Sequence, residues 1–420
     1  MKRIMKGILV IADGLGGRPT DVNGKTCLEA ARTPALDELA QRGALGLVDP
    51  IGPGVRPGSD TAHLSLLGYD PHKVYTGRGV YECLGIGMDV REGDVCFRAN
   101  FASVEVRGSE YIVTDRRARR IESGQTELAA ALNEIRLETV HGVSSEFRAS
   151  TQHRGALLLR GAGLSRHVTE NDPHAKDVPA PRFQAEPGHD DEAAQRTAAA
   201  LNEFVERAHE ALRDHAVNLR RIEEKKPPAN FILARGAADY PQIESIESSF
   251  GVRGAVIAGG ALYRGVALVC GMTPIDVPGA TGGLDTDLAA KARATIAALE
   301  SFDYVFVHIK GTDNAGHDQD AAAKTGFIER IDREFFGPLV AGTDASITHI
   351  AFTGDHTTPI DFGDHTHEPV PVLFFGPNVA RDETKAFGER EAGRGGLGRW
   401  SGRVLPMLLG YNNWSPKFGS

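Results

Sequence analysis

The sequence predicts an α/β protein in which a mostly parallel sheet is flanked by helices and an α+β domain is inserted into the chain. Continuous apolar runs near both ends of the chain are typical of strands that are covered on both faces. Helical patterns alternate with these runs, as they do in parallel sheets. A middle segment of short alternating strands and one long amphipathic helix interrupts this order, which indicates an insertion.

The first forty residues predict a strand, a loop and a helix. The apolar run Ile8–Ala12 reads as a buried parallel strand, and it stops at Asp13. Thr33 is a favoured N-cap residue, and Pro34 occupies the first helical position, where its missing N–H costs nothing. Gly43 is expected to end this helix.

The C-terminal third repeats the same order. The expected elements are a helix at 285–300, a strand at 304–309, a helix at 325–340, and strands at 347–352 and 372–375. Strands separated by helices of this length predict parallel crossover connections.

The middle of the chain follows a different pattern. Residues 97–121 alternate in the manner of short strands, and residues 193–213 carry a helical apolar stripe. The Lys225–Pro228 stretch is interpreted as the linker that returns to the core. The expected domains are therefore a core of residues 1–95 and 229–420 and an inserted domain of residues 96–228.

Composition excludes several classes of protein. The chain has 47 Lys and Arg against 56 Asp and Glu, a net charge of −9, which disfavours nucleic-acid binding. Its four cysteines are widely spaced, which disfavours a disulfide framework. Its apolar runs are too short to span a membrane, and a strand beginning at Ile8 leaves no room for a signal peptide. We expect a cytoplasmic protein with neither nucleic acid nor membrane as partner; the oligomeric state is not predicted.

Acidic and imidazole side chains follow the ends of the predicted strands. These candidates are Asp13, Asp313, His317, Asp355, His356 and His365. Because ligands of open α/β sheets bind at the carboxyl ends of the strands, we expect these side chains to gather at one site. A mixed set of carboxylate and imidazole ligands suits Mn, Zn or Co better than an all-oxygen cage does. Two such ions would clamp a transferring phosphoryl group.

A nucleophile is expected in the segment Pro57–His63. Ser59 and Thr61 are the candidate hydroxyls, at what reads as the start of a helix, where backbone amides attract anions. Each residue also has a structural interpretation: Asp13 alone could be an N-cap, and Ser59 alone could be a capping serine. His349, inside an apolar strand, is interpreted as a core histidine, and His308 remains open between the two roles.

Several motifs together resemble one family, the archaeal-type cofactor-independent phosphoglycerate mutases of the alkaline phosphatase superfamily. The motifs are Gly58–His63, Gly68–Pro71, Thr76–Gly79, Asp115–Arg117, Asp313–His317, Gly354–His356 and His365–Pro371. The similarity runs from Asp13 to Gly419, nearly the whole chain. It implies an alkaline-phosphatase-like core with an inserted substrate-binding lid domain.

The resemblance also implies roles for individual residues. Ser59 would be the nucleophile and form a phosphoserine. One divalent metal ion would be held by Asp13, Ser59, Asp355 and His356, and a second by Asp313, His317 and His365. Manganese is the first expectation for both ions, with Mg, Co or Zn as alternatives. His367 is a rival to His365, although the following Pro-Val-Pro favours His365.

The implied reaction interconverts 3-phosphoglycerate and 2-phosphoglycerate without 2,3-bisphosphoglycerate. The expected substrate-binding residues are His63, Arg116, Arg117, Arg154, Arg235 and Arg264, the last two in the returning core. Family members carry glycine where Arg119 stands here. A phosphatase, a phosphopentomutase or another phosphoryl transferase would share the same metal core, and a metal-binding regulatory protein is a further alternative.

Overall fold

The computed structural model describes residues 5–419, and the chain divides into two compact units. The first contains the residues up to Tyr75 and those from Ile243 onward, and the second runs from Thr76 to Gln242. Every helix in the part of the chain that is described is too short or too polar to cross a membrane.

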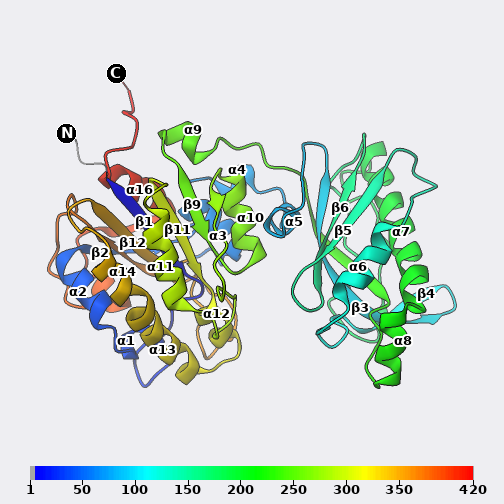
Figure 1. Ribbon diagram of the computed structural model, residues 1–420, viewed down its shortest axis with the longest axis horizontal. Coiled ribbons are helices and arrows are strands. Elements are labelled where there is room, and N and C mark those ends of the chain that lie inside the picture. Colours follow the sequence, from blue (N-terminus) through cyan, green and yellow to red (C-terminus); the bar gives the residue numbers. More distant parts are fainter. Residues whose placement is uncertain (1–4, 420) are drawn as a thin grey trace. The chain divides into compact units, whose positions relative to one another are not determined.

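The first unit is built on a mixed, mostly parallel sheet, as the sequence predicted (Figure 1). Its strands lie in the order β10 (Thr273–Pro274), β9 (Gly254–Ile257), β11 (Tyr304–Ile309), β1 (Lys6–Ala12), β12 (Thr348–Gly354), β13 (Val370–Phe375), β2 (Ala44–Asp49) and β14 (Gly398–Ser401). The strands from β10 to β12 are parallel to one another. The expected strand at 372–375 is present as β13, but it runs antiparallel to both of its neighbours.

Helices cover both faces of this sheet. One face carries α1 (Cys27–Ala30), α2 (Pro34–Arg42), α11 (Leu288–Ala298), α13 (Ala321–Arg330), the π-helical segment η1 (Ile331–Phe336) and α14 (Gly337–Gly342). The other elements are α3 (Ser59–Leu66), α4 (Pro71–Val74), α9 (Ile246–Phe250), α10 (Ala261–Val269), α12 (Gly311–His317), α15 (Glu389–Ala392) and α16 (Val404–Tyr411). Side chains of β11 alternate between the faces: Val305 and Val307 pack under α11, whereas Phe306 and His308 face α3 and α10.

Helix α2 begins where the sequence predicted, with Thr33 as N-cap and Pro34 at the first position. Its first amides are satisfied by Asp332 rather than by the Thr33 side chain: Asp332 accepts from the N–H of Ala35 at 3.2 Å and of Leu36 at 2.7 Å. Asp332 belongs to η1, which interrupts the single helix expected at 325–340. The π turn therefore supplies an anionic cap to a neighbouring helix.

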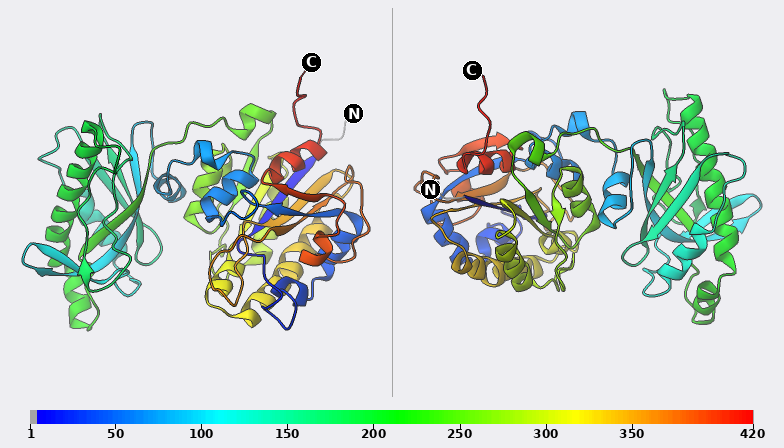
Figure 2. Two further views of the ribbon diagram at one scale, coloured as in Figure 1. Left: turned by 180° about the vertical axis from the view of Figure 1, so that it is seen from behind. Right: turned by 45° about the horizontal axis from the view of Figure 1, so that its top comes forward.

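The second unit packs its own antiparallel sheet against a long helix, as Figures 1 and 2 show. Its strands are β5 (Ser144–Ala149), β6 (Arg154–Arg160), β3 (Val95–Arg107), β4 (Glu110–Asp115), β7 (Val178–Pro179) and β8 (Phe231–Ala238), the last paired with β3. Its helices are α5 (Gly79–Gly85), α6 (Gln125–Asn133), α7 (Glu192–Arg213) and α8 (Ala216–Glu223). The predicted apolar stripe of α7 is buried in this unit's core.

This unit extends beyond the expected 96–228 at both ends. Strand β8 pairs with β3, from Ala102 opposite Phe231 to Cys96 opposite Ala238, so the chain leaves the unit only after β8. The Lys225–Pro228 stretch joins α8 to β8 and is not the return linker. Consequently Arg235, expected in the returning core, lies in the second unit.

Candidate functional site

The carboxyl ends of three neighbouring parallel strands bring the expected acidic and imidazole residues together. Asp13 follows β1, Asp313 lies on α12 directly after β11, and Asp355 and His356 follow β12. His365 enters from the loop before β13. Because β1 pairs with both β11 and β12, these residues are neighbours although they lie some 300 positions apart in the chain.

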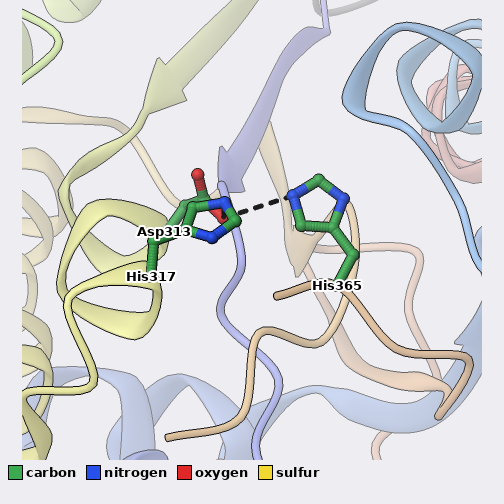
Figure 3. Close-up of side chains that lie close together, drawn as sticks. All are labelled: Asp313, His317 and His365. Carbon is green, nitrogen blue, oxygen red and sulfur yellow. Dashed lines mark ion pairs between the residues drawn. The ribbon is translucent and has the colours of Figure 1, made fainter. Parts of the chain in front are cut away.

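Asp313, His317 and His365 form one group of potential ligands, which Figure 3 shows. Nε2 of His317 lies 3.3 Å from Oδ1 of Asp313, and Nε2 of His365 lies 3.6 Å from the same oxygen. Nδ1 of His317 faces the Gly363 carbonyl at 2.9 Å, and Nδ1 of His365 faces the Pro57 carbonyl at 2.9 Å. Since a carbonyl only accepts, each Nδ1 carries a proton, and Nε2 is the nitrogen that each ring turns toward Asp313.

A second group surrounds Nε2 of His356. This atom lies 3.3 Å from Oδ1 of Asp13, 3.4 Å from Oδ2 of Asp355 and 3.4 Å from Oγ of Ser59. It also lies 4.0 Å from Oδ1 of Asp313, which places the two groups side by side. Asp13, Asp355 and His356 are fully buried.

The site contains buried carboxylate oxygens that cations could bind. Oδ1 of Asp13 and Oδ2 of Asp355 are buried oxygens to which nothing in residues 5–419 donates a hydrogen bond. Burial, reinforced by Asp13, raises the pKa of Asp355 well above its ordinary value. Burial also acts to raise the pKa of Asp13, but Lys310, His308 and His356 together hold it well below its ordinary value. Buried oxygens of this kind are typical of metal ligands, because isolated buried carboxylates are strongly disfavoured.

Two further side chains contact these carboxylates. His308, left open by the sequence, lies with Nε2 3.0 Å from Oδ2 of Asp13, and its ring stacks on Tyr263 at 3.4 Å. Burial lowers the pKa of His308 to about 3, so the ring is neutral and donates to Asp13. Nζ of Lys310 lies 2.7 Å from Oδ2 of Asp313 and 3.3 Å from Oδ2 of Asp13. The sequence could have indicated this role of His308, because His308 lies near the carboxyl end of β11, beside the end of β1 that leads to Asp13.

Of the two candidate hydroxyls, Ser59 is the one that faces the ligands. It is the first residue of α3, and its Oγ approaches His356. The Thr61 hydroxyl instead donates to the Gly58 carbonyl at 3.1 Å. Asp60 accepts from the Tyr75 hydroxyl at 2.7 Å, which fixes the start of the helix.

His63 and His367 lie outside the two groups of potential ligands, although Nδ1 of His63 lies 3.5 Å from Oδ2 of Asp355. His63 is wholly buried, and its Nδ1 donates to the Ser59 carbonyl at 2.6 Å. Burial lowers the pKa of His63 to about 4. The ring therefore supports the backbone behind Ser59 rather than facing solvent. His367 is exposed, whereas its rival His365 is part of the ligand group.

The second unit contains a cluster of arginines on its sheet. Arg154, Arg98 and Arg235 come from β6, β3 and β8, which are adjacent strands, and Arg98 lies directly opposite Arg235. Glu82 of α5 lies between them, with Oε1 3.8 Å from Nε of Arg98. Burial, together with the neighbouring Arg78, lowers the pKa of Arg98 to about 9. Sequence reasoning missed Arg98, because an arginine inside a strand pattern resembles any outward-facing residue.

The remaining expected arginines have different surroundings. Arg116 forms two hydrogen bonds with Asp172, at 2.6 and 2.7 Å, and Arg117 is exposed. Arg119 has a φ of +52°, the left-handed conformation that favours glycine. Arg264 lies on α10 of the first unit, where it pairs with Asp276.

Comparison with known proteins gives a consistent result. The model of the 2,3-bisphosphoglycerate-independent phosphoglycerate mutase family matches residues 40–218. A 2,3-bisphosphoglycerate-independent phosphoglycerate mutase from Methanopyrus kandleri is 46% identical, over 99% of this chain and 98% of that protein. A solved protein from Pyrococcus horikoshii has a TM-score of 0.85 and 38% identity, covering 99% of both chains. The cofactor-independent phosphoglycerate mutase from Thermoplasma acidophilum has a TM-score of 0.69 and 33% identity, covering 97% of this chain and 100% of that one.

Proposed function

The chain belongs to the family of 2,3-bisphosphoglycerate-independent phosphoglycerate mutases, and from this we propose that it interconverts 3-phosphoglycerate and 2-phosphoglycerate through a phosphoserine at Ser59. As a member of this family it is an isomerase that moves a phosphoryl group within its substrate. The observation that carries the proposed chemistry is that one hydroxyl, that of Ser59, lies close to buried carboxylates and to Nε2 of His356.

The donor set fits two divalent metal ions. Asp13, Ser59, Asp355 and His356 would hold one, and Asp313, His317 and His365 the other. The buried oxygens of Asp13 and Asp355, which receive no hydrogen bond within residues 5–419, support this assignment. When bound, such ions supply a lowered hydroxyl pKa and neutralise charge on the phosphoryl oxygens. Nitrogen and oxygen donors together favour Mn²⁺, with Co²⁺, Zn²⁺ or Mg²⁺ as alternatives.

The proposed transfer has two halves. The Ser59 hydroxyl loses its proton and its oxygen attacks the phosphorus of 3-phosphoglycerate, while the bond from phosphorus to O3 breaks and O3 takes up a proton to leave glycerate. The 2-hydroxyl of the retained glycerate then loses its proton and attacks the phosphoserine. The bond from phosphorus to the Ser59 oxygen breaks, and that oxygen takes up a proton, giving 2-phosphoglycerate. The ammonium group of Lys310 is placed to balance negative charge beside Asp13 and Asp313.

We assign the glycerate to the arginine cluster of the second unit. Arg98, Arg154 and Arg235 lie on adjacent strands, and the planar guanidinium group suits a carboxylate. Retention of glycerate and exclusion of water are what separate a mutase from a phosphatase, and the lid role expected for the inserted domain would fall to this unit. Because Arg116 is hydrogen-bonded to Asp172, we assign it to stabilising its own loop rather than to binding substrate.

A coupled assay tests the proposal directly. The metal-stripped chain is reloaded separately with Mn²⁺, Co²⁺, Mg²⁺ or Zn²⁺, and 3-phosphoglycerate is converted with added enolase, without 2,3-bisphosphoglycerate. We expect phosphoenolpyruvate to form and free phosphate to stay near background. Release of free phosphate without phosphoenolpyruvate would identify a phosphatase instead.

A further inference from the structure

The three histidines of the metal centre are oriented in two different ways. His317 and His365 each donate Nδ1–H to a backbone carbonyl, which no side-chain substitution removes. Nδ1 of His356 lies 3.0 Å from a side-chain hydroxyl, that of Thr358, two residues further along the chain. The orientation of His356 therefore depends on one replaceable group.

The same hydroxyl contacts the other group of ligands. Oγ1 of Thr358 lies 3.0 Å from Oδ1 of Asp313, and Thr358 is fully buried. Nζ of Lys310 lies 2.7 Å from the other oxygen of Asp313, and a carboxylate that binds a metal ion carries no proton, so in the proposed metal centre Oδ1 of Asp313 only accepts. The single hydroxyl proton of Thr358 must then go to Asp313.

This leaves one arrangement of protons. Because the Thr358 hydroxyl has given its proton to Asp313, it can only accept from His356, and Nδ1 of His356 must donate. Nε2 of His356, which faces Asp13, Asp355 and Ser59, is then the ring nitrogen left to bind a metal ion. All three histidines thus carry a proton on Nδ1 and turn Nε2 toward the site.

The backbone carbonyl of Thr358 accepts a hydrogen bond from a buried lysine. Lys324 of α13 is fully buried, and its Nζ donates to the carbonyls of Thr358 and Gly16, both at 2.8 Å. Gly16 lies in the loop after β1, so Lys324 ties the loop that carries Asp13 to the loop that carries His356. The hydroxyl is therefore fixed relative to both loops.

We propose that Thr358 is a positioning residue whose hydroxyl sets the tautomer of His356 and the orientation of Asp313, so that one side chain aligns a ligand of each metal ion. Outer partners of metal-bound histidines fix ring orientation and basicity, and their loss commonly weakens metal binding by about 10–100-fold. This inference rests on the proposed metal centre but not on the mutase reaction.

The test measures metal binding without substrate. Co²⁺ is titrated separately into the metal-stripped parent chain and into its Thr358→Val and Thr358→Ser variants. Each titration is monitored by calorimetry and by the visible spectrum of bound Co²⁺. We expect Thr358→Val to bind Co²⁺ about 10–100-fold more weakly with an altered spectrum, and Thr358→Ser to restore the parent values. Thr353→Val is the matched control, since Thr353 is equally buried but within residues 5–419 its hydroxyl donates only to the carbonyls of Gly354 and Pro371.

Two outcomes would overturn the inference. One is Co²⁺ binding by Thr358→Val with parent affinity and spectrum; the other is equal weakening by Thr353→Val. A parent chain that binds no Co²⁺ would instead refute the metal centre itself. Should Thr358→Val not fold, ¹H–¹⁵N correlation of ¹⁵N-histidine in the Zn²⁺-loaded parent decides: we expect the proton of His356 on Nδ1, and a proton on Nε2 would contradict the inference.

Discussion

The two units of this chain carry charged clusters of opposite sign, built in opposite ways. In the first unit, carboxylates and imidazoles meet at the ends of parallel strands, and buried oxygens such as Oδ1 of Asp13 lack a donor within residues 5–419. In the second, Arg98, Arg154 and Arg235 lie across the middle of an antiparallel sheet. The first cluster suits cations and the second suits anions. Under the proposed function, the first cluster would make and break the phosphate ester, and the second would bind the rest of the substrate.

Removing the hydroxyl of the first cluster should have the largest effect. We expect Ser59→Ala to lower kcat by more than about 10³-fold, because no covalent intermediate can form. Thr61→Val should stay within about tenfold of the parent, since within residues 5–419 the Thr61 hydroxyl donates only to the Gly58 carbonyl. Steady-state kinetics of the coupled assay measures both. A Ser59→Ala variant with parent activity would rule out the phosphoserine.

Removing a charge from the second cluster should change binding more than chemistry. We expect Arg98→Met to raise KM by about 10–100-fold, because one or two charge-assisted hydrogen bonds to the substrate would be lost. The change in kcat should be smaller. Metal content, measured by elemental analysis, should equal that of the parent. The exposed Arg119, replaced by Ala, is the control. If Arg98→Met lowered metal content and left KM unchanged, the division of roles between the units would be wrong.

Lys324 tests how the first cluster is supported. We expect Lys324→Met to lower the free energy of unfolding by about 1–3 kcal/mol, because two buried carbonyls, those of Gly16 and Thr358, lose a donor. Urea denaturation of the metal-stripped chain measures this. Lys324→Arg keeps the charge but not the shape of the side chain, and its free energy of unfolding should lie between those of the parent and of Lys324→Met. Equal stability of parent and Lys324→Met would show that the buried amine contributes nothing to holding the loops.

The smallest effect is expected in the arginine-rich loop of the second unit. Arg119 has a φ of +52°, so Arg119→Gly should relieve backbone strain and raise stability by about 1 kcal/mol or less. Arg117→Gly, at a neighbouring exposed position, should instead be neutral or destabilising. Thermal unfolding followed by calorimetry compares the two. A lower Tm for Arg119→Gly than for Arg117→Gly would contradict the assigned loop geometry.

The sequence predicted the first cluster better than the second for a physical reason. Parallel strands end at a common edge, so Asp13, Asp313 and Asp355 could be expected together from their positions alone. Contacts across an antiparallel sheet depend on register, which turns and bulges decide, and β3 contains such an irregularity between Cys96 and Arg98. Without that register, Arg98 could not be distinguished from other outward-facing strand residues, and β8 was assigned to the wrong unit.

Supporting residues were the hardest to predict. Thr358 and Lys324 belong to common residue types, and their role comes only from buried contacts with loops far away in sequence. The resemblance implied a substrate-binding role for His63, but its ring is fully buried and its Nδ1 donates to the Ser59 carbonyl. By contrast, His349 was correctly interpreted as a core histidine: it contacts Asn412 at 3.0 Å and receives the N–H of Asn378.

The central claim is that two divalent ions lie between side chains drawn from separate segments of the first unit. The most direct test is a crystal of the Mn²⁺-loaded chain measured at the manganese absorption edge. We predict two anomalous peaks, one among Asp13, Ser59, Asp355 and His356 and one among Asp313, His317 and His365. Manganese at only one of these groups, or at neither, would contradict the account.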